Sequence, residues 1–134
     1  MSNNRSPDQP KESTMTAQQI KNLKVTHPGY WIQSRNKQGV ISYTPVKGTP
    51  VNLTDFPDLD LFAHHTVAPW SFGDSPEYQK GWTVSSGHSG HIIAYHSRLK
   101  SLAIAAARLR IETYSHGDIL ELIAKHPLTP RYLP

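Results

Sequence analysis

The chain contains no cysteine, which excludes disulfide bonds, thiolate nucleophiles and zinc sites built on thiolates. It also has no run of about eighteen apolar residues, the length that a membrane span requires, and its N-terminal segment lacks the apolar stretch of a signal peptide. These absences predict a cytoplasmic protein. Any metal ion would have to be bound by His, Asp, Glu or backbone oxygens.

The charge balance is mildly basic, with 14 Lys and Arg against 10 Asp and Glu and a formal net charge of +4. Such a bias is compatible with binding to a polyanion or to an acidic protein surface and requires neither. Residues 1–19 are rich in Ser, Asn, Gln and Pro, and we expect them to form a disordered polar tail. Ile20 and Leu23 lie at helical spacing, which is compatible with a short helix that begins at Thr16. The length of the remaining segment fits a single α+β domain over residues 20–134.

Residues 30–44 read YWIQS, RNKQG and VISYT, which are two β-branched and aromatic segments around a glycine-containing connection. This pattern predicts a first hairpin. Residues 61–67, LFAHHTV, predict a further strand. The following stretch, residues 68–81, is dense in Gly, Pro, Ser and Asp, and we expect a loop with Trp70 or Phe72 packed inward.

Residues 82–97 read WTVSSGHSGHIIAYHS, two alternating runs around the turn residues SSGHSG, and predict a second hairpin. Ser97 then occupies the expected N-cap position of a helix over residues 98–111, which is rich in Ala and Leu and free of Gly and Pro. A shorter helix is predicted over residues 117–126, and the last residues, PLTPRYLP, are expected to form an extended tail.

The long predicted helix has two apolar sides. One stripe consists of Leu99, Leu102, Ala106 and Leu109. Ile104 and Ile111 lie nearly opposite this stripe, so apolar side chains are available for packing on both sides of the helix. We expect this helix to be covered on two sides. The predicted architecture is therefore an antiparallel β-sheet of four to five strands, packed by one long helix with a shorter C-terminal helix beside it.

Three histidines of the second hairpin, His88, His91 and His96, suggest either a chemical site or an ordinary turn. If a strand begins near residue 91, His91 and His96 differ by an odd number of positions and point to opposite faces of the sheet. One metal ion cannot then be bound by both. We therefore interpret these histidines as exposed or half-exposed hairpin residues, and we assign no catalytic residue.

A second candidate site is the segment DLDLFAHH. Asp58, Asp60, His64 and His65 could place carboxylates and imidazoles around a divalent ion, as in a metal-assisted hydrolase. Their spacing matches neither a zinc-protease nor a calcium-binding motif, and acidic residues beside prolines are typical of a solvated loop. The metal site is therefore an alternative hypothesis.

The first hairpin supplies a third candidate site, because basic and aromatic residues are interleaved there without an acidic residue. Such a surface suits single-stranded nucleic acid, with cations for phosphates and rings for bases, and it also suits a protein partner. The candidate binding residues are Tyr30, Trp31, Arg35, Lys37, Tyr43 and Lys47. The alternative is that the aromatic residues belong to the core and the basic ones to an ordinary charged turn.

The segment from Trp82 to Ala107 contains the pattern W-T-V, S-G, I-A-Y, S-R and A-I in order. It resembles strand-strand-helix modules in small proteins carried by phages and plasmids, although the resemblance points to no named family. The resemblance implies an accessory role, such as modulating a host or defence complex by binding it. The resemblance assigns no function to any particular residue of this chain.

These observations together favour a small non-enzymatic binding protein that acts on a protein or nucleoprotein complex and needs no cofactor. No phosphate-binding loop, dinucleotide fingerprint or catalytic spacing is present in the sequence. Direct nucleic-acid binding through residues 30–47 is the first alternative, and a metal-assisted hydrolase is the second. The partner, the oligomeric state and the strand order stay open at this point.

Overall fold

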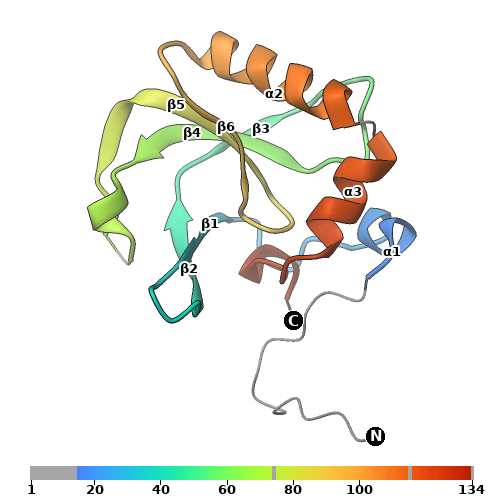
Figure 1. Cartoon of the computed structure of the whole chain (residues 1–134), viewed down its shortest axis with the longest axis horizontal. Helices are drawn as coiled ribbons and strands as arrows, with labels where there is room; N and C mark the ends of the chain where they lie inside the picture. Colours follow the sequence, from blue (N-terminus) through green and yellow to red (C-terminus); the bar gives the residue numbers. More distant parts are fainter. Residues whose placement is uncertain (1–14, 74, 115, 134) are drawn as a thin grey trace, which may run out of the picture.

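The computed structural model describes residues 15–133 with the exception of 74 and 115 (Figure 1). The structure is α+β, and the predicted long helix and shorter C-terminal helix are both confirmed. Among the described residues, no helix is both long and apolar enough to cross a membrane. The strands are β1 (Tyr30–Arg35), β2 (Ile41–Val46), β3 (Thr49–Val51), β4 (Leu61–Val67), β5 (Tyr78–Ser86) and β6 (Ile92–Ser97). The helices are α1 (Ala17–Lys21), α2 (Lys100–Tyr114) and α3 (His116–Ala124), with short 3-10 turns at Pro69–Ser71 and Pro130–Tyr132.

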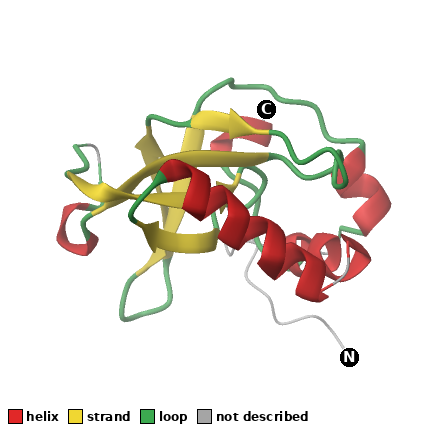
Figure 2. Ribbon diagram, turned by 90° about the horizontal axis from the view of Figure 1, so that it is seen from above, coloured by secondary structure: helices red, strands yellow, loops and turns green. Residues whose placement is uncertain are grey.

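The strands form two antiparallel sheets. Four of them pair in the order β3-β4-β5-β6, whereas β1 and β2 pair only with each other. Helix α2 covers one side of the four-stranded sheet, and the β1–β2 hairpin lies on the other side, next to the C-terminal segment (Figure 1). Helices α1 and α3 lie together at one end of the molecule (Figure 2). Both predicted hairpins are therefore present, but the first one does not extend the main sheet.

Strand β4 is buried on both of its faces, because side chains of a strand alternate between the two sides of a sheet. Leu61 and Ala63 point into the larger apolar core beneath α2 and α3. Phe62 points to the opposite side, where its ring stacks on Tyr30 of the first hairpin at 4.3 Å between centroids. The hairpin thus shields the second face of the sheet from water.

Helix α2 packs on the sheet through Ala103, Ala107 and Ile111, which are completely buried. The prediction that its leucine stripe faces the protein is wrong. Leu102 and Leu109 are 47% and 67% exposed, respectively. Alanine has almost no side chain beyond Cβ, so a stripe of alanines lets the helix approach the sheet closely, and the longer leucines are left on the outside.

Two local details near the helices also differ from the sequence predictions. Ser97 belongs to β6 and α2 begins only at Lys100, so Ser97 is not its N-cap. At the N-terminus, residues 17 to 19, which were assigned to the polar tail, are helical in α1. This short helix begins with a capping box in which Thr16 and Gln19 exchange backbone and side-chain hydrogen bonds. The earlier part of the expected tail lies outside the described residues.

The aromatic residues of the loop before β5 are not packed inward as expected. Trp70 is 74% exposed and Phe72 is 39% exposed. The indole nitrogen of Trp70 donates a hydrogen bond to the carboxylate of Glu77 at 3.0 Å. Phe62 and Val67 are instead packed with residues of the two-stranded hairpin, Tyr30, Ile32 and Val46.

The C-terminal segment is not an extended tail, because it is fixed to the body of the protein by Asp60. The guanidinium of Arg131 donates a hydrogen bond from Nε to Oδ2 of Asp60 at 2.7 Å, and the hydroxyl of Tyr132 donates to the same oxygen. The Arg131 guanidinium also lies 4.4 Å from the ring centre of Tyr30. Tyr132 is only 8% exposed as a result.

The turn of the second hairpin is buried, which is unusual for a polar connection. The amide of Gly87 donates to the backbone oxygen of Asp60 at 2.7 Å. Thr129 satisfies two further backbone groups, since its hydroxyl donates to the Gly87 oxygen and its amide donates to the His88 oxygen, both at 2.8 Å. The polar turn is therefore enclosed by the C-terminal segment, and these backbone groups are paired within the protein, whereas Nδ1 of His88 is buried without a partner.

Gly87 allows this close packing, because a Cβ atom at this position would overlap the carboxylate of Asp60. We predict that Gly87→Ala lowers the free energy of unfolding by about 3 kcal/mol, since the overlap forces the carboxylate away from Arg131 and Tyr132. Gly39→Ala is the control, because Gly39 has a positive φ of 78° but open space around its Cα. It should cost about 1 kcal/mol. Urea denaturation of both variants tests this, and equal losses would contradict the packing.

Candidate binding pocket beside the second hairpin

The three histidines of the second hairpin contact different parts of the protein. His88 stacks on Tyr132 with 4.7 Å between ring centres, and His91 packs on His126 at 3.6 Å. Nδ1 of His96 forms a hydrogen bond with the hydroxyl of Thr66 at 2.9 Å. Within the part of the chain that the structure describes, no three His, Asp or Glu side chains are grouped to hold a metal ion. The expectation of exposure is wrong for His88, which is 3% exposed.

The four candidate metal ligands are not brought together either. Asp58 forms an ion pair with Lys21 at 3.6 Å, and Asp60 is bound by the C-terminal segment as described above. His64 points to the side of the sheet that carries Phe62 and the first hairpin, where Nε2 pairs with the hydroxyl of Ser85 at 2.9 Å. His65 points to the side of α2 and packs on Trp82, with 3.9 Å between ring centres. Each group therefore has its own separate partner.

The aromatic residues of the first hairpin serve the fold in part. Tyr30 packs between Phe62 and Arg131, and the hydroxyl of Tyr43 donates to the backbone oxygen of Pro127 at 3.1 Å. Trp31 is half-buried. Stacking of nucleic-acid bases requires free ring faces, which Tyr30 does not offer.

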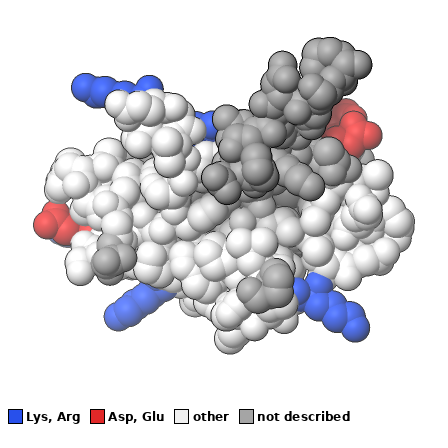
Figure 3. All heavy atoms as spheres, turned by 90° about the horizontal axis from the view of Figure 1, so that it is seen from below, with Lys and Arg blue, Asp and Glu red and all other residues white. Residues whose placement is uncertain are grey.

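The basic residues of this hairpin, Arg35, Lys37 and Lys47, are exposed. On the face seen in Figure 3, the Lys and Arg side chains stand apart from one another at the edges, with acidic groups also at the rim. A nucleic-acid site requires several cations that follow one path. The visible part of this face shows no such path, and direct nucleic-acid binding remains a hypothesis that no observation favours.

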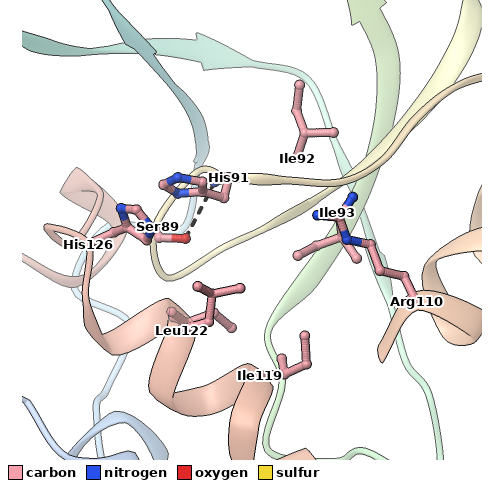
Figure 4. A pocket seen from close by; sticks show the side chains of 9 residues that line it. Ser89, His91, Ile92, Ile93, Arg110, Ile119, Leu122 and His126 are labelled. Atoms are coloured by element: carbon pink, nitrogen blue, oxygen red, sulfur yellow. Dashed lines mark hydrogen bonds between the residues drawn. The ribbon is translucent and has the colours of Figure 1, made fainter. Parts of the chain in front are cut away.

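A pocket of about 110 Å³ lies between the turn of the second hairpin, β6, α2 and α3 (Figure 4). Its walls are mostly aliphatic, with four polar side chains added. The lining residues are Ser89, His91, Ile92, Ile93, Arg110, Ile119, Leu122, Ile123 and His126. Residues from the hairpin and from both helices thus meet at one concave site, the arrangement that is typical of ligand pockets.

His91 and His126 form one end of this pocket (Figure 4). The Nδ1 atom of His91 is buried and has no hydrogen-bond partner in the structure. Burial, together with the neighbouring His126 and Arg35, lowers the pKa of His91 to about 4. Burial and the charges of Arg35 and Lys125 also lower the pKa of His126. Both rings are therefore neutral at pH 7 and present uncharged, flat surfaces to a ligand.

Arg110 approaches the pocket from the other side, with its guanidinium near Ile93 (Figure 4). Among the described residues it has neither an ion-pair partner nor a hydrogen-bond acceptor, in contrast to Arg108, which binds Asp55 at 2.9 Å. An unpaired guanidinium beside an aliphatic wall can bind a carboxylate in a geometry that provides two parallel hydrogen bonds. The pocket therefore combines an apolar floor with one anion-binding group.

Neither the His91–His126 pair nor the His64–Ser85 pair has the geometry of an accessible catalytic pair. The rings of His91 and His126 are in contact, so no reacting group of a substrate fits between them as it must between a general acid and a general base. The His64–Ser85 pair has the hydrogen bond of an activated nucleophile, but the two side chains are 2% and 0% exposed. A substrate cannot reach this serine. The pocket is suited to binding.

Sequence reasoning considered His91 but interpreted it as an ordinary hairpin residue, and it missed His126 and Arg110. His126 was only the last residue of the predicted C-terminal helix, and Arg110 lay within the predicted long helix without an assigned role. A signal was present in the second case, because an arginine one residue before the buried Ile111 must lie close to the edge of the packed face.

No family model, no curated protein and no solved structure matches the chain.

The buried histidines predict a loss of stability at mildly acidic pH. Burial lowers the pKa values of His64, His88, His91 and His126, so below pH 6.5 the unfolded chain binds more protons than the folded chain. The contribution of these histidines to the free energy of unfolding is fully present above pH 6.5 and is lost as the pH falls towards 4. We expect the free energy of unfolding to fall steadily between pH 7 and pH 5 in urea titrations.

The histidine pair of the pocket should account for part of this pH dependence. We predict that His91→Gln with His126→Gln makes the slope of unfolding free energy against pH clearly smaller, because two of the four groups no longer titrate. Gln38→Ala, an exposed and non-titrating position in the first hairpin turn, is the control and should leave the slope unchanged. An unchanged slope in the double histidine variant would show that the pair is not buried as described.

Proposed function

We propose that the protein is a non-enzymatic binding protein that recognises a segment of a protein partner through the pocket beside the second hairpin. The observation that carries this proposal is the combination of an aliphatic pocket with the unpaired guanidinium of Arg110 at its side. The pocket volume of about 110 Å³ is smaller than the roughly 150 Å³ of a cavity that binds benzene. It suits one aliphatic side chain.

The surroundings of the pocket favour an acidic partner. Arg110 is unpaired among the described residues, and Arg35 and Lys125 are close enough to His126 to lower its pKa. A carboxylate placed beside the inserted side chain would therefore meet positive charge and would find a guanidinium to pair with. The recognised segment consists of an aliphatic anchor with an Asp or Glu near it.

The rim of the pocket favours a protein over a small molecule. Ile92 and Leu122 line the pocket and are still 43% and 41% exposed. A ligand that filled only the pocket would leave these apolar rims in water, whereas a polypeptide would cover them. Such an arrangement, with a central anchor and surrounding apolar contacts, is typical of protein interfaces.

Selection from a random peptide library on the purified protein tests this function. We expect the selected peptides to share an aliphatic residue with an acidic residue beside it. Arg110→Ala should weaken binding of such peptides about tenfold, because a charged hydrogen-bonded pair is lost. Leu122→Ala should also weaken binding, through the loss of apolar contact at the rim.

Lys37→Ala is the matched control, since it removes an exposed cation that does not line the pocket, and it should leave peptide affinity unchanged. Failure to enrich a common motif would contradict the proposal. So would peptides that bind Arg110→Ala and Leu122→Ala as tightly as the unaltered protein. Salt-sensitive binding of single-stranded nucleic acid that depends on Arg35 and Lys37 would support the alternative function.

A further inference from the structure

Helix α2 and Leu99, the residue directly before it, carry an exposed apolar stripe that the fold does not use. The stripe consists of Leu99, Leu102, Ala106 and Leu109, and we call it the leucine stripe. Its leucines are 50%, 47% and 67% exposed in chain order. The protein packs against a different side of the same helix, through Ala103, Ala107 and Ile111. The leucine stripe therefore remains in contact with water unless another molecule covers it.

The spacing of the leucine stripe is that of a helix-pairing seam. Its residues follow one another at intervals of three, four and three positions, the alternation that places side chains on one line along two paired helices. Helix α2 contains 15 residues and is therefore about 22 Å long. The helix thus spans about two heptads, and the leucine stripe extends over about one and a half. The surface is suited to another helix.

We infer that the leucine stripe pairs with the same stripe of a second copy of this chain, with the two helices antiparallel. In this register Leu99 lies opposite the partner's Leu109, and Leu102 lies opposite the partner's Ala106. The small alanine faces a large leucine in both central layers, and the larger leucine pairs close the two ends. The stripe is thus complementary to itself about a twofold axis, as a symmetric dimer requires.

The charges beside the leucine stripe support this choice of partner and of direction. Arg98 precedes the helix and Glu112 lies near its end, and neither has an ion-pair partner among the residues that the structure describes. An antiparallel pair sets Arg98 against the partner's Glu112, and the symmetry repeats this contact. A parallel pair separates the two charges by about 21 Å, which is 14 residues along a helix. Charge complementarity therefore favours the antiparallel dimer.

This inference goes beyond the proposed peptide recognition, because it uses a different side of α2. At 100° per residue, Arg110 projects between the buried stripe and the leucine stripe, and the pocket lies on the side of Arg110. Loss of the dimer would leave the pocket residues in place. The two proposals can therefore fail independently.

Sedimentation equilibrium of the full chain over a range of concentrations tests the dimer. We expect the unaltered protein to dimerise and Leu109→Asp to be monomeric, with an unchanged circular dichroism spectrum because Leu109 is an exposed residue. Arg98→Glu should weaken the dimer roughly tenfold, since two attractions become two repulsions. The double variant Arg98→Glu with Glu112→Arg should restore it, because the opposite charges again face each other.

Lys37→Glu, a charge reversal of the same size on the first hairpin, should have no effect on association. A monomeric chain at the highest concentrations would overturn the dimer. A dimer that Leu109→Asp leaves intact would overturn the leucine stripe as its interface. A dimer that breaks in Leu109→Asp but does not respond to the charge exchange would overturn the antiparallel arrangement.

Discussion

Asp60 joins three segments that are far apart in the sequence. Its carboxylate accepts hydrogen bonds from Arg131 and Tyr132, and its backbone oxygen accepts one from the amide of Gly87. The C-terminal segment and the turn of the second hairpin are thereby fixed to the start of β4. A partly buried carboxylate without the donors of Arg131 and Tyr132 would be destabilising, so the C-terminal segment has to be placed against it.

The buried turn is a direct consequence of this connection. Because the C-terminal segment lies over it, His88 is held between the turn and Tyr132 and is shielded from water. The chain then leaves the turn at His91, whose ring packs on His126. The same constraint thus sets the position of one end of the pocket, although Asp60 is not part of the pocket itself.

The local elements were predictable from the sequence, and the long-range contacts were not. Alternation around Trp82 and Val84 indicates the second hairpin, and a stretch rich in Ala and Leu without Gly or Pro indicates α2. These signals depend on neighbouring residues only. The ion pair between Asp60 and Arg131 spans 71 positions and has no local signal, so the last residues were expected to be an extended tail. For the same reason His126 was not connected with His91.

The helical pattern of apolar residues in the sequence also could not show which of the two apolar sides of α2 is buried. Hydrophobicity alone favours the leucines as the buried side, since they remove more apolar area from water than alanines do. The fold instead uses Ala103 and Ala107, which permit a short distance between helix and sheet. The sequence also could not show which candidate residues of the first hairpin are buried. Tyr30 covers Phe62, whereas Lys37 remains in solvent.

Hydrogen exchange at single amides of the second hairpin turn tests the central claim most directly. The amides of Ser86, Gly87 and Gly90 donate to backbone oxygens at 2.7 to 2.8 Å within this buried turn. They should exchange as slowly as the amides of β4 and β5, because only global unfolding exposes them. Exchange within seconds at these positions, with β4 and β5 still protected, would show that the turn is open to solvent and would contradict the account.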